Sequence, residues 1–250
     1  MYTRILSLFL IFAMVISLAA CGGGELTIIS SDTPAGGEAS GVPYSSDVTS
    51  SEEDENKPDI NSWELRLVNK WNTISDADAP ELVNISETFA WANDKRFDAR
   101  AIDAITALCE AAHKDGAMLF IISAYRTDAT QQRLFNNEVN AVKRDNPSLS
   151  QEQAEVKAAT EVARPGTSEH QLGLAVDFNS VEQNFEDTKE SKWLEEHAHE
   201  YGFIMRYPKD KQDITAVIYE PWHYRYVGVE YAKMIKESGL CLEEFVEQYK

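Results

Sequence analysis

The sequence predicts an α+β fold in which a small, mostly antiparallel sheet is flanked by helices. Segments with apolar residues at helical spacing are interspersed with short apolar runs that are typical of buried strands. The order of these segments shows no regular strand–helix–strand repeat, which a parallel sheet would need. We therefore expect antiparallel strands and helices to share one core.

Three regions follow one another along the 250-residue chain. Residues 1–21 contain an early Arg4 and then sixteen uncharged residues, which is short for a membrane span of about 20 residues. We interpret this region as a signal peptide. Residues 22–62 are rich in Gly, Ser, Thr, Pro and acidic residues, so they should form a disordered tether. Residues 63–250 should form the folded domain.

The leader ends in the residues Leu-Ala-Ala-Cys, and this ending resembles the lipobox of bacterial lipoproteins. The resemblance implies that Cys21 is acylated, becomes the new N-terminus and anchors the chain to the membrane through its lipid. An ordinary signal peptide and an uncleaved anchor are the alternatives. All three interpretations place the remainder outside the cytoplasmic membrane. We expect an extracytoplasmic protein that is lipid-anchored to the bacterial cell membrane.

The elements of the folded domain follow from apolar spacing and from residues that end helices. Helices are predicted over residues 94–116, 128–144, 148–166, 190–202, 229–239 and 242–250. Strands are predicted over residues 117–125, 172–178, 203–208 and 215–228. Gly116 and Gly202 end the first and fourth helices. Ser150 and Gln153 have the spacing of a capping box at the third helix, and Pro165 should end it.

The charge of the chain excludes one class of partner. With 23 basic and 42 acidic residues, the net charge is −19. Nucleic-acid phosphates are bound by Lys and Arg, so we expect no nucleic-acid partner.

The stretch RPGTSEHQLGLAVDF, residues 164–178, places Asp177 inside an apolar run. Burying a charge is unfavourable by several kcal/mol unless the charge is paired or binds a metal. His170 lies seven residues earlier and could supply a second metal ligand. In one straight strand the two side chains would point to opposite faces. We therefore expect the chain to bend between them, at Gly173.

A third ligand candidate is His223, in the aromatic stretch EPWHYRYVG. A catalytic zinc has three protein ligands and keeps one position open, so one zinc per chain is predicted. Glu220, three residues before His223, could accept a proton from the attacking water. Cys109 and Cys241 lack the C-x-x-C spacing of a thiolate zinc site. They could form a disulfide, but buried free thiols are the favoured interpretation.

Further polar residues could bind the substrate of such a hydrolase. Arg126 follows a predicted central strand, and Gln131 lies early in the next helix. An arginine there could bind an oxyanion or a carboxylate through two hydrogen bonds. Ser168, two residues before His170, could donate another hydrogen bond. The residues by themselves indicate a zinc hydrolase of amides.

The segments SAYRT…Q, PGTSEHQLGLAVDF and EPWHYRYVG, in this order, resemble the VanY-type zinc D-alanyl-D-alanine carboxypeptidases. These belong with lysostaphin-like peptidases and the hedgehog signalling domain in one zinc superfamily. The resemblance covers about residues 63–250 and implies that this region is a catalytic domain with zinc on its sheet. The family commonly has SGYRS where this chain has SAYRT, a conservative change that keeps the arginine.

The resemblance also implies roles for individual residues. The implied zinc ligands are His170, Asp177 and His223. Glu220 corresponds to the catalytic base, and Arg126, Gln131 and Ser168 correspond to substrate-contacting residues.

Removal of the terminal D-alanine from peptidoglycan stem peptides is the function that the resemblance implies. A preference for D,D or L,D bonds stays open, as does the length of the stem. A wall-peptide endopeptidase with the same chemistry is one alternative, and an open-ended cleft would mark it. A non-catalytic peptidoglycan-binding lipoprotein is another, and the loss of the base would mark it. Glu220 is present in this chain.

Overall fold

The computed structural model describes residues 57–250. The predicted signal peptide, the expected lipidation site Cys21 and residues 22–56 of the expected tether lie outside the described residues. Within residues 57–250, no helix combines the length and the apolar character that crossing a membrane requires.

A four-stranded antiparallel sheet forms the centre of the domain. Its strands lie in the order β3 (Ile121–Ser123), β4 (Ala175–Phe178), β6 (His223–Tyr226) and β5 (Phe203–Met205). The predicted α+β fold with a small antiparallel sheet is confirmed. The strand before Arg126 is an edge strand, however, and the prediction that it is central is wrong. Backbone hydrogen bonds between Ile121 and the segment 89–91 cover that edge.

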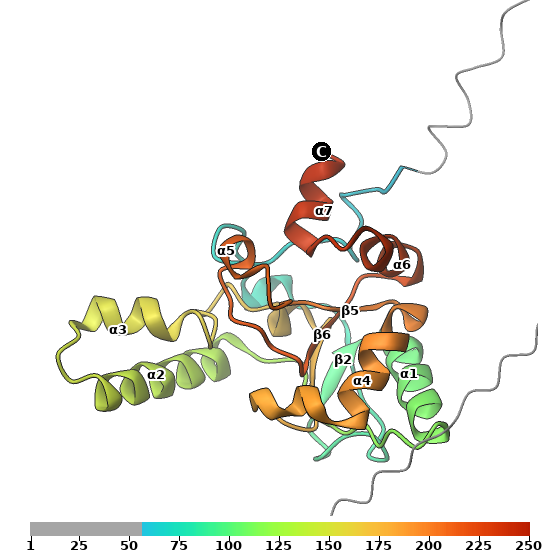
Figure 1. Ribbon diagram of the computed structural model, residues 1–250, viewed down its shortest axis with the longest axis horizontal. Helices are drawn as coiled ribbons and strands as arrows, with labels where there is room; N and C mark the ends of the chain where they lie inside the picture. Colours follow the sequence, from blue (N-terminus) through green and yellow to red (C-terminus); the bar gives the residue numbers. More distant parts are fainter. Residues whose placement is uncertain (1–56) are drawn as a thin grey trace, which may run out of the picture. The chain divides into compact units, whose positions relative to one another are not determined.

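Helices surround the sheet in three groups (Figure 1). Helices α1 (Ile102–Lys114) and α4 (Lys189–His197) pack on the largest apolar cluster, which includes Val176 and Phe178 of β4. Helices α6 (Val229–Ser238) and α7 (Leu242–Gln248) form a second cluster with Ile204 of β5.

Helices α2 (Asp128–Asp145) and α3 (Gln151–Ala158) extend to one side as an antiparallel pair with a small core of their own (Figure 1). The predicted capping box of Ser150 and Gln153 is present at α3. That helix ends at Ala158 and not at Pro165, so the predicted end is wrong. Residues 159–167 are therefore not helical, and they lead from the α2–α3 pair back toward the sheet.

Two other predicted elements differ from the observed ones. Residues 94–101, predicted as helix, contain β2 (Arg96–Asp98), which pairs with β1 (Leu82–Asn84) in a separate two-stranded sheet. Pairing with a distant segment and complete burial of Phe97 outweigh the local helical pattern. The predicted strand 215–228 is reduced to β6, since α5 (Gln212–Thr215) ends at its start and Pro221 interrupts the backbone pairing.

Gly202 ends the α4 segment, as predicted, after a 3-10 turn over Ala198–Tyr201. Its φ of +84° lies in the left-handed region, where a side chain is disfavoured. A Cβ there would lie 2.8 Å from Cε2 of Tyr226. Cys109 and Cys241 are buried free thiols, as favoured by the sequence.

Candidate active site and metal centre

Strand pairing and one tight turn bring three candidate ligands together. Asp177 of β4 lies directly opposite His223 of β6, so their side chains share one face of the sheet. His170 lies in the 3-10 turn η2 (Glu169–Leu172), immediately before β4. Gly173 ends this turn with a φ of +70° and redirects the chain into the strand. The expected bend at Gly173 is present and lets His170 reach Asp177.

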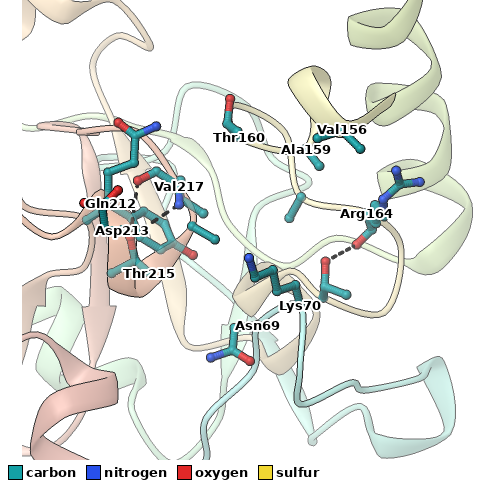
Figure 2. A pocket seen from close by; sticks show the side chains of 14 residues that line it. Asn69, Lys70, Val156, Ala159, Thr160, Arg164, Gln212, Asp213, Thr215 and Val217 are labelled. Atoms are coloured by element: carbon teal, nitrogen blue, oxygen red, sulfur yellow. Dashed lines mark hydrogen bonds between the residues drawn. The ribbon is translucent and has the colours of Figure 1, made fainter. Parts of the chain in front are cut away.

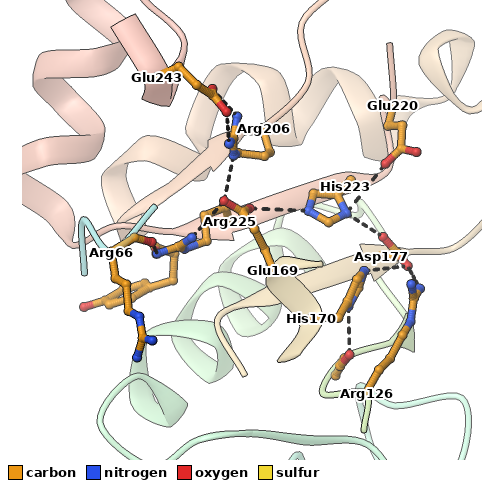
Figure 3. A network of polar contacts seen from close by, with 12 residues as sticks. Arg66, Arg126, Glu169, His170, Asp177, Arg206, Glu220, His223, Arg225 and Glu243 are labelled. Carbon is orange, nitrogen blue, oxygen red and sulfur yellow. Dashed lines mark hydrogen bonds and ion pairs between the residues drawn. The ribbon is translucent and has the colours of Figure 1, made fainter. Parts of the chain in front are cut away.

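The three side chains are buried and in contact (Figure 3). Nε2 of His170 lies 3.2 Å from Oδ2 of Asp177, and Nδ1 of His223 lies 3.1 Å from Oδ1. The three ligand atoms lie within 4.8 Å of one another. A tetrahedral zinc with bonds near 2.0–2.1 Å separates its ligand atoms by about 3.3 Å. Two imidazoles and a carboxylate at these distances fit zinc.

The electrostatics of the cluster suit a cation. Burial lowers the pKa of His170 to about 4, and Arg126 acts in the same direction. His170 is therefore neutral and available as a ligand, and its Nδ1–H donates to the carbonyl of Ala124 at 2.7 Å. Burial alone would lower the pKa of His223, but the nearby carboxylates of Asp177 and Glu169 raise it to about 9. The carboxylates around His223 thus favour positive charge at this site, and a bound metal ion would supply it.

Glu220 lies beside the cluster but outside the set of ligand atoms. It is 7% exposed, and its Oε2 lies 3.7 Å from Nδ1 of His223. Burial raises the pKa of this carboxyl to about 8. A carboxyl beside a metal centre, with raised basicity and no hydrogen bond to the ligands, is suited to proton transfer.

Arg126 reaches the same place from the end of β3. Its Nη2 donates to Oδ2 of Asp177 at 2.6 Å and to Oγ of Ser123 at 2.7 Å. The Arg126 side chain is 18% exposed and lines a cavity of about 770 Å³. That cavity is also lined by Ser168, Glu220 and the three candidate ligands. A guanidinium adjacent to a metal centre could bind a carboxylate or an oxyanion.

The structure gives Gln131 a position that differs from the expected one. Its side chain is fully buried and is not on the cavity wall. Nε2 donates to the carbonyl of Ala163 at 2.7 Å, and Oε1 accepts from Nη1 of Arg126 at 3.4 Å. In the structure Gln131 therefore contacts Arg126 and the segment returning from α3, and its expected contact with the substrate stays a prediction.

A second cavity, of about 490 Å³, is also lined by that returning segment (Figure 2). Lys70 and Arg164 line it, and it contains none of the candidate ligands. The backbone N–H of Ile218 donates to the carbonyl of Thr160 at 2.9 Å and joins the two chain segments between the cavities. The reactive groups thus lie in the larger cavity alone.

Sequence reasoning missed a buried network of charges behind His223 (Figure 3). Oε1 of Glu169 accepts from Nε of Arg206 at 2.8 Å and from Nη1 of Arg225 at 2.9 Å. Arg206 also donates twice to Glu243 of α7, at 2.7 and 2.6 Å. A charge inside a strand pattern, the signal that singled out Asp177, also marks Arg225 and could have found it.

Comparisons with known proteins agree with this site. A family model described as VanY, D-alanyl-D-alanine carboxypeptidase, matches residues 94–229. A D-alanyl-D-alanine carboxypeptidase of Enterococcus faecalis is 43% identical over 192 residues, which cover 77% of this chain and 69% of the relative.

Two solved structures extend the agreement. A crystal structure of a mutant of the vancomycin resistance D,D-pentapeptidase VanY in complex with Zn(II) is 43% identical. It has a TM-score of 0.65 and covers 74% of this chain and 99% of its own. The LdcB LD-carboxypeptidase is 38% identical with a TM-score of 0.65, covering 75% of this chain and 87% of its own. The chain belongs to the VanY family of D-alanyl-D-alanine carboxypeptidases.

Proposed function

We propose that this protein is a zinc-dependent carboxypeptidase that removes the terminal D-alanine from peptidoglycan stem peptides. The observation that carries the proposal is the buried cluster of His170, Asp177 and His223 in a cavity that also contains Glu220 and Arg126. Similarity to a D,D-pentapeptidase with zinc and to an LD-carboxypeptidase supports both the metal and the class of substrate.

His170, Asp177 and His223 would hold the zinc, which supplies Lewis-acid assistance to hydrolysis when it is bound. Glu220 would act as the base. Its carboxylate lies on the cavity wall, where it can accept a proton from the attacking water and transfer it to the leaving nitrogen. Its burial excludes bulk water from this transfer.

Arg126 would bind the negative charge of the substrate. Ser123 and Gln131 hold its guanidinium by hydrogen bonds, so little side-chain freedom is lost when a ligand carboxylate arrives. Ser168 lies on the same cavity wall and is 3% exposed. Its hydroxyl would donate to a backbone carbonyl of the substrate. Arg126 and Ser168 would take no part in the proton transfer, which Glu220 would carry out.

Mass spectrometry of the products from defined tripeptide, tetrapeptide and pentapeptide stems tests this function. Loss of one D-alanine from the pentapeptide indicates D,D-carboxypeptidase activity, and loss from the tetrapeptide indicates L,D-activity. Cleavage within a cross-linked dimer, without release of a terminal residue, would support the endopeptidase alternative. No hydrolysis of any stem by the zinc-loaded protein would favour a binding module.

We propose further that Cys21 carries a lipid and anchors the enzyme outside the cytoplasmic membrane. The ending Leu-Ala-Ala-Cys after an apolar run supports this proposal. Cys21→Ser should release the protein or leave it unprocessed, since one acylated cysteine would be its anchor. Membrane fractionation of the parent and the variant tests it. A mature Cys21→Ser protein that stays with the membrane as the parent does would contradict the proposal.

A further inference from the structure

We propose that Glu169 is a positioning residue for the third zinc ligand: it accepts a hydrogen bond from Nε2–H of His223 and so directs Nδ1 of that ring toward the metal. The inference rests on the zinc site of the proposed function. It concerns a side chain that touches neither the substrate cavity nor the expected position of the metal.

One unpaired atom of Glu169 faces one unpaired atom of His223. Oε2 of Glu169 and Nε2 of His223 lie 3.8 Å apart, and Figure 3 shows the two groups pointing toward one another. Within residues 57–250, both atoms are buried and have no hydrogen-bond partner. A small rotation of either side chain would close the gap to hydrogen-bonding distance. Buried polar groups are almost always paired, so each atom is the natural partner of the other.

Two arginines hold Glu169 in the required orientation. Arg206 and Arg225 both donate to its Oε1, at 2.8 and 2.9 Å, which leaves Oε2 free for His223. All three charged side chains are fully buried. A carboxylate oxygen between two guanidinium donors can only accept, so the free Oε2 of Glu169 is an acceptor for His223.

An acceptor at Nε2 decides which nitrogen of His223 can bind a metal. With the proton held on Nε2, the lone pair lies on Nδ1, and Nδ1 is the atom that faces Asp177. Carboxylates commonly fix metal-binding imidazoles in this way. His170 shows the complementary arrangement, since its Nδ1–H donates to Ala124 and leaves Nε2 for the metal. The η2 turn thus supplies one ligand, His170, and the residue that orients another.

Zinc affinity of matched variants tests the proposal. Glu169→Asp keeps the charge that the arginines need but withdraws the carboxylate from His223 by one methylene. Its affinity, measured by competition with a fluorescent chelator on protein shown to be folded, should fall by about 10–100-fold. Glu243→Gln is the control, because Glu243 pairs with Arg206 at the far end of the same network and does not touch His223. It should bind zinc as tightly as the parent.

An equal loss of affinity in Glu169→Asp and Glu243→Gln would show that the network is merely structural and would overturn the proposal. Unchanged affinity in Glu169→Asp would do the same. A parent protein that binds no zinc would overturn the proposed function as well, so the two failures are distinguishable.

A measurement on the parent protein keeps the proposal testable if the variants fail to fold. Nuclear magnetic resonance of the zinc-loaded, ¹⁵N-histidine-labelled protein should show His223 with metal on Nδ1 and a slowly exchanging proton on Nε2. In Glu169→Asp that proton should shift and exchange faster. Metal on Nε2, or an Nε2 without a proton, would overturn the proposal.

Discussion

Replacement of Glu220 by glutamine should remove most of the hydrolysis and leave the metal in place. The amide has the same number of heavy atoms as the carboxyl, but it cannot accept the proton of the attacking water. Loss of a positioned acid–base group lowers rates by about 10²–10⁴-fold. That decrease corresponds to about 3–5 kcal/mol in the activation free energy.

The structure also predicts what Glu220→Gln should leave unchanged. Oε2 of Glu220 lies 3.7 Å from Nδ1 of His223, so no hydrogen bond to a ligand is lost. The carboxyl is 7% exposed, and a neutral amide tolerates such burial at least as well as a carboxylate. Zinc content and thermal stability should therefore stay close to those of the parent. Arg126 and Ser168 are untouched, so an uncleaved stem peptide should still bind.

The assay combines release of D-alanine from a stem peptide, followed by mass spectrometry, with zinc content by elemental analysis. Glu196→Gln, the same chemical change at an exposed position of α4, is the control and should keep full activity. Loss of zinc in Glu220→Gln would make Glu220 a ligand and reopen the role of Asp177. Unchanged hydrolysis would place the base elsewhere.

Three further predictions concern the metal, the substrate and the fold. Single alanine substitutions of the proposed ligands should lower the zinc content well below one per chain in elemental analysis, because two ligands make a poor site. The substitutions are His170→Ala, Asp177→Ala and His223→Ala. Full occupancy in any one of them would remove that residue from the ligand set. A stem peptide amidated at its C-terminus should be cut poorly in kinetic assays, because Arg126 would lose a charged partner contributing about 1.5–3 kcal/mol; equal turnover of acid and amide would point to an endopeptidase. Gly116 and Gly202 both have a φ of +84°, but a Cβ at Gly116 has no atom within 4 Å, whereas one at Gly202 lies 2.8 Å from Tyr226. Urea unfolding should show a loss of about 1–2 kcal/mol for Gly116→Ala and a larger loss for Gly202→Ala, and equal losses would exclude the clash.

The residues of the candidate metal site could be selected from the sequence alone. A carboxylate within an apolar strand is unfavourable without a partner, so Asp177 required an explanation that His170 and His223 could supply. The bend at Gly173 followed from the two-residue period of strands. Local signals also determined the cap of α3 and the glycine end of the α4 segment, because both depend on residues within a few positions of each other.

The tertiary structure decided whatever depends on distant segments. Strand β2 replaced the start of the helix expected over residues 94–116, because its hydrogen bonds join residues 82–84 to 96–98. The position of β3 at the sheet edge, and not at its centre, depends on which strands pair across long loops. Gln131 is buried because Ala163, 32 residues later, folds back on it. Glu169 faces His223 only through the pairing of β4 with β6 and the two arginines behind it. No local pattern contains those contacts, since burial and pairing of a charge are properties of the folded chain.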